Sequence, residues 1–212
     1  LIVAQAADAV AKLASVLLIF FLVHRLVAGG FEGWGLSWRQ LPRGVLLGIL
    51  GWFIIFPWLV LVSSVCEYIV VHVFHTHMGV HETLKALETQ PSFAASMSLF
   101  LLAAIAAPVL EEIFFRGLLQ TMLCQPGWGF AAPRSEHDLH VRPSVAHRWA
   151  AILIVSAIFA AAHLMPAQFL VLFLLALALG YLYERTGNLW ACITLHATFN
   201  SVVMTSVIFG AR

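Results

Sequence analysis

Residues Phe93–Leu123 read FAASMSLFLLAAIAAPVLEEIFFRGLLQTML, and this segment is the most informative about the fold. Its charged residues are Glu111, Glu112 and Arg116, close together in a mainly apolar sequence. About 20 apolar residues in a helix cross the ~30 Å hydrocarbon core of a bilayer. A charged group at the bilayer centre costs at least about 2.5–3.5 kcal/mol and therefore needs a partner inside the protein. The stretch predicts a transmembrane helix that carries part of a functional site.

The rest of the chain is similarly apolar. Of its 212 residues, 62% are hydrophobic and 10% are charged, and the mean hydropathy is +0.96. A soluble domain carries about 25% charged residues. Backbone groups in lipid must bond within the protein, and the sequence lacks the alternation of a barrel. We expect an all-α, multi-pass transmembrane bundle, one domain over residues 1–212 with a motif-bearing core at about 93–209. About six spans are predicted: Ala9–Ala28, Val45–Val71, Phe93–Leu123, Trp149–Leu164, Phe169–Glu184 and Leu189–Phe209.

The charges of the connecting segments orient this topology. One side has Arg25, Arg39, Arg43, Arg134, Arg142, Arg148 and Arg185, and the other has Lys12, Lys85 and Arg212. The positive-inside rule places the arginine-rich side in the cytoplasm. An interfacial aromatic belt is expected on the same side, from Trp34, Trp38, Trp128, Trp149 and Trp190. The net charge of +1 argues against a nucleic-acid partner, and the high apolar content makes the bilayer the expected environment. The chain does not open with Met, and we expect that residues can precede Leu1.

Polar residues within three predicted spans share a pattern of helical spacing. Glu112 and Arg116 are four residues apart, which suits an ion pair within one helix. Glu111 lies about 100° away around that helix, so it is free to face another element. Phe159 and His163 share one helix face, and so do His196 and Asn200. The spans place these groups at a similar depth, which predicts one site.

These residue types suit the attack of water on a carbonyl carbon. A buried glutamate can take a proton from water, and His163 can hold the water or relay the proton. His196 and Asn200 can donate hydrogen bonds to the oxyanion, each worth roughly 3 kcal/mol in a site that excludes water. The predicted catalytic residues are Glu111, His163, His196 and Asn200.

The three motifs E-E-x-x-x-R, F-x-x-x-H and H-x-x-x-N follow in this order on successive apolar segments. Together they resemble the CAAX protease and bacteriocin-processing family, whose members include the type II CAAX prenyl endopeptidases. The resemblance implies a glutamate-dependent intramembrane endopeptidase with no cofactor or obligatory metal, acting on a peptide or membrane-protein substrate. It implies that Glu112, Arg116 and Phe159 support the site. The stretch Trp34–Arg43 is similar to bacterial members, which implies a bacterial cell membrane with the site in its cytoplasmic half.

Several other interpretations stay open. Glu112 with Arg116 suits a purely structural ion pair, and Phe159 suits packing better than chemistry. A metal-dependent hydrolase with Glu111, His163 and His196 as ligands is the alternative enzyme. A membrane scaffold or a transporter of the same fold is the alternative outside enzymes. The connection that contains His72, His75, His77 and His81 suits a solvated loop better than a metal site. Glu67 and Glu184 lie near span ends and are given no role.

Overall fold

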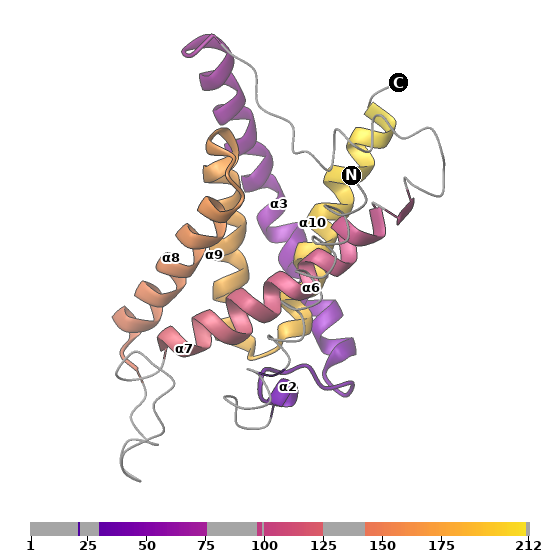
Figure 1. Cartoon of the computed structure of the whole chain (residues 1–212), viewed down its shortest axis with the longest axis vertical. Helices are drawn as coiled ribbons and strands as arrows, with labels where there is room; N and C mark the ends of the chain where they lie inside the picture. Colours follow the sequence, from indigo (N-terminus) through magenta and orange to yellow (C-terminus); the bar gives the residue numbers. More distant parts are fainter. Residues whose placement is uncertain (1–20, 22–29, 76–96, 99, 125–142, 211–212) are drawn as a thin grey trace, which may run out of the picture.

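The computed structural model describes residues 21, 30–75, 97–98, 100–124 and 143–210, and the elements in these ranges are helical (Figure 1). The all-α class is confirmed for this part of the chain. Two segments, η1 and η2, have the wider π-helical turn. The elements are α2 Gly30–Gly33, α3 Leu41–His72, η1 Leu102–Ala106, α6 Ala107–Glu112, η2 Ile113–Gln120, α7 Thr121–Cys124, α8 Val145–Ala162, η4 Pro166–Gln168, α9 Phe169–Thr186 and α10 Leu189–Gly210.

Three helical stretches in the described part are long and apolar enough to cross a membrane: Phe31–His72, Val145–Ala162 and Pro166–Thr186. They match the second, fourth and fifth predicted spans. The described parts of the third and sixth segments are also helical, but the third holds three charged residues, and α10 holds His196, Asn200 and several hydroxyl side chains. Nearly all of the first segment, Ala9–Ala28, lies outside the described residues. The count of six spans therefore stays a prediction.

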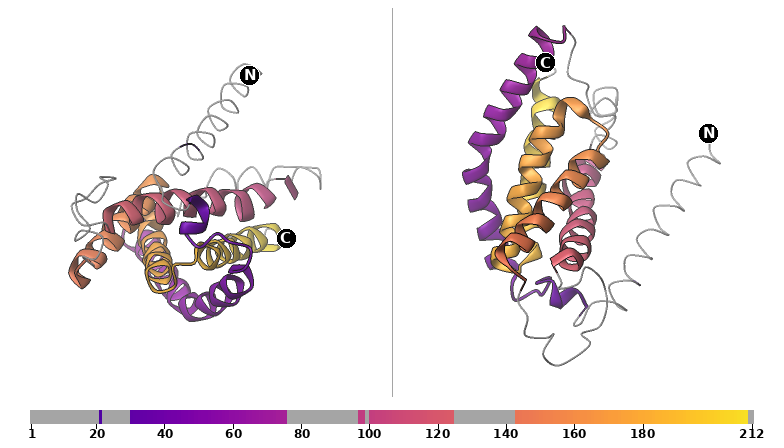
Figure 2. Two further views of the ribbon diagram at one scale, coloured as in Figure 1. Left: turned by 90° about the horizontal axis from the view of Figure 1, so that it is seen from below. Right: turned by 90° about the vertical axis from the view of Figure 1, so that its left-hand side faces the viewer.

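Helices α3, α9 and α10 pack against one another, and α8 lies along α9 (Figure 2). The continuous stretch from η1 to α7 crosses α10 and also contacts α8 and α9. Glycines let α3 approach α10 closely. A Cβ added to Gly48 would lie 2.6 Å from the Cβ of Thr194 and 2.7 Å from the carbonyl oxygen of Ala191. Small residues commonly mark such close contacts between membrane helices.

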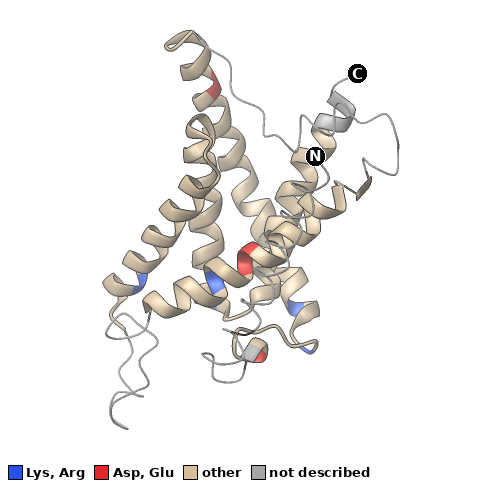
Figure 3. Cartoon of the chain, viewed as in Figure 1, with Lys and Arg blue, Asp and Glu red and all other residues tan. Residues whose placement is uncertain are grey.

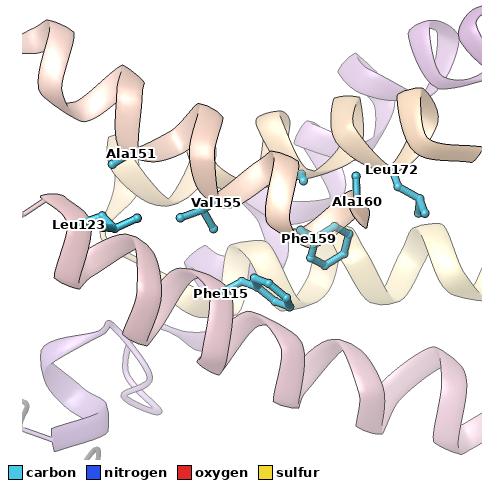
Figure 4. Packing of buried hydrophobic residues seen from close by; sticks show 8 residues of the cluster. Phe115, Leu123, Ala151, Val155, Phe159, Ala160 and Leu172 are labelled. Carbon is cyan, nitrogen blue, oxygen red and sulfur yellow. The ribbon is translucent and has the colours of Figure 1, made fainter. Parts of the chain in front are cut away.

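An apolar cluster joins η2 to α8 and α9 (Figure 4). Phe115 and Phe159 meet edge to face in this cluster, with ring centroids 5.0 Å apart. Because Phe159 is fully buried, it fixes α8 against η2. The remaining members are Leu123, Ala151, Val155, Ala160, Leu172 and Ala176.

Trp34 departs from the expected aromatic belt. Its side chain is only 1% exposed, whereas that of Trp38 is 78% exposed. The ring of Trp34 covers Gly117 on η2, where an added Cβ would lie 2.6 Å from Trp34 Cε3. The backbone oxygen of Trp34 also accepts a hydrogen bond from the N–H of Leu189, at the start of α10. Trp34 therefore belongs to the core, because it closes the bundle beneath η2.

Candidate active site

Charged residues lie in the middle of the bundle, where α6 and η2 pass the other helices (Figure 3). Arg116 Nη1 donates to Glu112 Oε1 at 3.1 Å, and both side chains are 0% exposed. The predicted ion pair is thus confirmed. Arg116 Nη2 also donates to the carbonyl oxygen of Ala176 at 3.2 Å. Its guanidinium carbon lies 4.8 Å from the centre of the Phe159 ring, so the cation is enclosed by polar and aromatic partners.

The oxygen of Glu112 that meets Arg116 also meets His196. The distance from His196 Nδ1 to Glu112 Oε1 is 2.8 Å. A carboxylate paired with an arginine accepts hydrogen bonds, so it holds the proton of His196 on Nδ1. The bond joins α10 to α6 and directs Nε2 of the same imidazole toward Glu111. Glu112 therefore orients His196 as well as pairing with Arg116.

Glu111 faces two histidines. Its Oε2 lies 3.8 Å from Nε2 of His196 and 4.0 Å from Nε2 of His163. These separations exceed the length of a direct hydrogen bond. The Glu111 side chain is 30% exposed and that of His163 is 22% exposed, whereas His196 is buried. The structure thus brings together three predicted site residues from α6, α10 and the end of α8, on the more open side of the charged cluster.

The apolar sequence around His163 predicts that this residue lies within a helix. In the structure it lies just past the end of α8. The helix ends at Ala162, and His163 is its C-terminal cap. His163 Nδ1 lies 2.8 Å from the carbonyl oxygen of Phe159. The two rings are 4.6 Å apart, as expected for residues that share a helix face. A carbonyl oxygen only accepts, so His163 carries a proton on Nδ1 and turns Nε2 toward Glu111.

Asn200 lies one turn beyond His196 on α10. Its Nδ2 donates to the carbonyl oxygen of Ala103 at 2.8 Å. Ala103 is in η1, where a π-helical turn pairs each carbonyl with the N–H five residues on. The fifth residue after Ala103 is Pro108, which has no N–H, and Asn200 supplies the missing donor. One of the two amide hydrogens of Asn200 is therefore committed to the backbone.

Sequence reasoning missed a second pair of contacts between η2 and α9. Gln120 Nε2 donates to the carbonyl oxygen of Gly180 at 3.0 Å, just as Arg116 donates to that of Ala176. Donors and acceptors are both four residues apart, so the two side chains form consecutive rungs between the helices. The sequence signal for these contacts is the four-residue spacing of Arg116 and Gln120, which matches the spacing of the small residues Ala176 and Gly180 on α9.

Glu184 has a structural partner, although it was given no role. Arg148 Nη1 on α8 donates to Glu184 Oε1 on α9 at 3.0 Å. Nearby, Nε2 of His147 lies 2.8 Å from the carbonyl oxygen of Leu123, at the end of α7. These contacts hold α7, α8 and α9 together at the end opposite His163.

The described residues include no group of three His, Cys, Asp or Glu side chains placed to hold a metal ion. In the histidine-rich connection, His72 Nδ1 meets the carbonyl oxygen of Tyr68 at 3.1 Å. His77 and His81 lie outside the described residues. A groove of about 940 Å³ runs along another face of α10, and Glu111, His163 and His196 do not line it; its walls include Leu41, Trp190, Thr194, Thr198, Ser201 and Thr205.

Comparison with known proteins places the chain in a family. The family described as Type II CAAX prenyl endopeptidase Rce1-like matches residues 93–202, just over half of the chain. The matched region contains all three polar motifs and the helices from η1 into α10. No curated protein and no solved structure matches the chain. The chain belongs to this family, which is one of membrane proteases, and the predicted resemblance is confirmed.

Proposed function

We propose that this protein is an intramembrane endopeptidase that hydrolyses peptide bonds with water activated by Glu111 and His163. One observation carries the proposal. Oε2 of Glu111 lies within 4.0 Å of Nε2 on both His163 and His196. A single water can hydrogen-bond to a carboxylate oxygen and an imidazole nitrogen at this separation. Three ionisable groups from separate helices then surround one reactive oxygen.

The chemistry follows from the protons that each group holds. Glu111 takes a proton from the water as its oxygen attacks the peptide carbonyl carbon, and the carbonyl electrons move onto oxygen. Nε2 of His163 carries a lone pair in the neutral ring, because Nδ1 donates to Phe159, so it accepts a hydrogen bond from the water. The proton on Glu111 then passes to the leaving nitrogen as the C–N bond breaks. An acid and an amine result.

His196 suits the opposite task of donating to the oxyanion. The Glu112 carboxylate accepts from its Nδ1, and a ring that carries hydrogen on both nitrogens also donates from Nε2 to the oxyanion. The second amide hydrogen of Asn200 is the other proposed donor, since only one is described as bonded to Ala103. Donors fixed in advance stabilise the oxyanion most where water is excluded.

The substrate class follows from the family and from the site's surroundings. The family name specifies prenyl endopeptidases, and the chain carries apolar helices around Glu111. We propose a peptide or membrane-protein substrate that reaches the site within the bilayer. The arginine-rich ends of the helices would face the cytoplasm of a bacterial cell, and the site would lie in that half of the membrane.

The direct test uses the purified protein in liposomes with peptides that do or do not carry a prenyl group. Cleavage is followed by mass spectrometry. We expect Glu111→Gln to abolish turnover. Glu67 is an exposed glutamate on α3, and the control substitution Glu67→Gln should leave turnover unchanged. Cleavage that persists in Glu111→Gln would refute the assignment of the base. Absence of cleavage in the unaltered protein with every peptide would favour a scaffold.

The same assay separates the proposed mechanism from a metal-dependent one. Glu111, His163 and His196 are also residue types that bind metal ions. Retained activity after chelation, with no metal in the active protein, supports water activated by Glu111 and His163 without a metal ion. Loss of activity on chelation and its return with one added metal would replace this proposal with a metal-dependent hydrolase.

A further inference from the structure

Leu164, directly after His163, has a backbone conformation that few leucines adopt. Its φ is +53°, in the left-handed region that favours glycine and asparagine. Its side chain is 86% exposed, so packing within the described chain does not account for this conformation. A left-handed residue at this position commonly ends a helix. Strained backbone often lies beside functional groups.

The turn at Leu164 ends α8 directly before His163, so that the His163 ring can bond to a carbonyl of the last helical turn. The N–H of Leu164 bonds to the carbonyl oxygen of Ala161 at 3.0 Å and closes the helix. Phe159 is one of the last four residues of α8, whose carbonyls have no N–H partner further along a helix. His163 Nδ1 uses the Phe159 carbonyl at 2.8 Å. If α8 continued, backbone N–H groups would compete for that oxygen.

A second helix provides a comparison in which the residue after the histidine is right-handed, since Val73 has a φ of −97°. At the end of α3, His72 Nδ1 meets the carbonyl oxygen of Tyr68 four residues earlier, and the two rings stack 4.4 Å apart. His163 and Phe159 have the same spacing and the same kind of bond. The ring orientations differ, however, because the ring planes meet at 19° in Tyr68–His72 and at 47° in Phe159–His163, where the left-handed turn follows. Only at α8 does the ring orientation direct Nε2 toward a described glutamate, Glu111.

We propose that Leu164 is a positioning residue, whose left-handed turn stops α8 so that His163 keeps its proton on Nδ1 and presents the bare Nε2 to Glu111. This inference rests on the proposed function for its catalytic consequence. The predicted protonation of the His163 ring is independent of the proposed function. Leu164 acts through its backbone, and His163 is the group that meets the water.

Matched substitutions separate the backbone of Leu164 from its side chain. Leu164→Gly and Leu164→Asn tolerate a positive φ, whereas Leu164→Val keeps an apolar side chain but resists it, because its branched Cβ crowds the backbone. We expect Leu164→Gly and Leu164→Asn to keep kcat close to that of the unaltered protein. Leu164→Val should lower kcat by up to about 10²-fold with KM little changed, as expected for a misplaced reacting group.

The second readout is the nitrogen NMR spectrum of protein labelled at histidine, which distinguishes the two protonated forms of a neutral imidazole. We expect the Nδ1–H form at His163 in the unaltered protein and in Leu164→Gly, and its partial loss in Leu164→Val. His72 is the internal reference and should not change. An unaltered His163 signal in Leu164→Val would overturn the proposal. So would equal losses of kcat in the glycine and valine variants, because they would implicate the side chain.

The two proposals can fail separately. If Leu164→Val shifts the His163 signal but cleavage proves independent of Glu111, the positioning role stands and the proposed mechanism fails. If cleavage requires Glu111 and the His163 signal never changes, the mechanism stands and the role of Leu164 is wrong. Folding of each variant is checked by its circular dichroism in the same detergent.

Discussion

His196 on α10 and Glu112 on α6 are 84 positions apart in the chain, yet Nδ1 of the histidine lies 2.8 Å from Oε1 of the glutamate. Glu112 thereby connects Arg116 to His196, and His196 in turn faces Glu111. The adjacent glutamates have different surroundings. One is fully buried and orients its neighbours, while the other is partly open and faces two imidazoles.

The first prediction concerns Glu112 as the residue that orients His196. Glu112→Gln keeps the shape of the side chain but replaces the carboxylate with an amide, which has a donor as well as an acceptor and no longer fixes the proton of His196 on Nδ1. We expect the cleavage rate to fall by about 10²-fold or more, because loss of a carboxylate that orients a catalytic histidine can cost about 10⁴-fold. Initial rates with a fluorogenic peptide measure the effect, and exposed Glu32 on α2 provides the control Glu32→Gln. Equal rates would leave Glu112 a structural role only.

The second prediction concerns the stability of the buried ion pair. Arg116→Met leaves the Glu112 carboxylate without its cation and should destabilise the fold by about 3–5 kcal/mol. The double variant Glu112→Gln/Arg116→Met should recover much of this loss, because neither charge is then buried alone. Unfolding in detergent, followed by circular dichroism, gives the free energies. Losses that simply add in the double variant would contradict the coupling.

The third prediction concerns Asn200 and Pro108. Asn200→Ala leaves the carbonyl oxygen of Ala103 without a donor and should cost about 1 kcal/mol or more. In a Pro108→Ala background, the new N–H of residue 108 can reach that oxygen, so the same substitution should cost less. A double-mutant cycle of unfolding free energies measures the difference. A cost that is the same in both backgrounds would show that Pro108 does not create the need for Asn200.

The fourth prediction concerns Cys124, which lies just beyond the predicted span Phe93–Leu123. Burial raises the pKa of the Cys124 thiol to about 11, and the nearby Glu184 carboxylate adds to this rise. Alkylation needs the thiolate, so labelling at pH 9 should be slow. Glu184→Gln removes the negative charge, lowers the pKa and should speed labelling at that pH. Maleimide labelling followed by mass spectrometry tests this, with Cys124→Ser to identify the labelled site.

The raised pKa of the Cys124 thiol also implies a dependence of stability on pH. In the unfolded chain the thiol ionises near its ordinary value of 9.0, whereas in the folded chain it ionises near 11. The folded state therefore binds the proton more tightly, and its stability should fall as the pH rises from about 9 to about 11. Cys124→Ser should weaken this fall. An identical pH profile in that variant would contradict the assignment.

Helical spacing predicted those features of the site that depend on one helix. The pair Glu112–Arg116 and the shared face of Phe159 and His163 follow from a period of 3.6 residues, and both are present. The same reasoning treated Glu112 as a partner of Arg116 alone, because the bond to His196 joins segments distant in sequence. It also placed His163 inside a span, since an apolar sequence continues past Ala162 although the helix does not.

The interfacial belt shows the same limit. Tryptophans near span ends commonly lie at the membrane surface, and exposed Trp38 fits that expectation. Trp34 is four positions away and has the same local signals, but Gly117 on η2 leaves room for its ring. Only the packing of distant segments distinguishes the two tryptophans.

Hydropathy and helical spacing were enough to predict a membrane-embedded helical bundle, and to show that ionisable residues within its apolar segments need partners. Hydrophobicity and helical periodicity are local properties, so they can be recognised without coordinates. The tertiary structure alone decided which atoms meet: Glu112 with His196, Asn200 with the carbonyl of Ala103, and Glu111 between two imidazoles. These contacts depend on how helices cross and where each one ends, and packing across the whole bundle sets both.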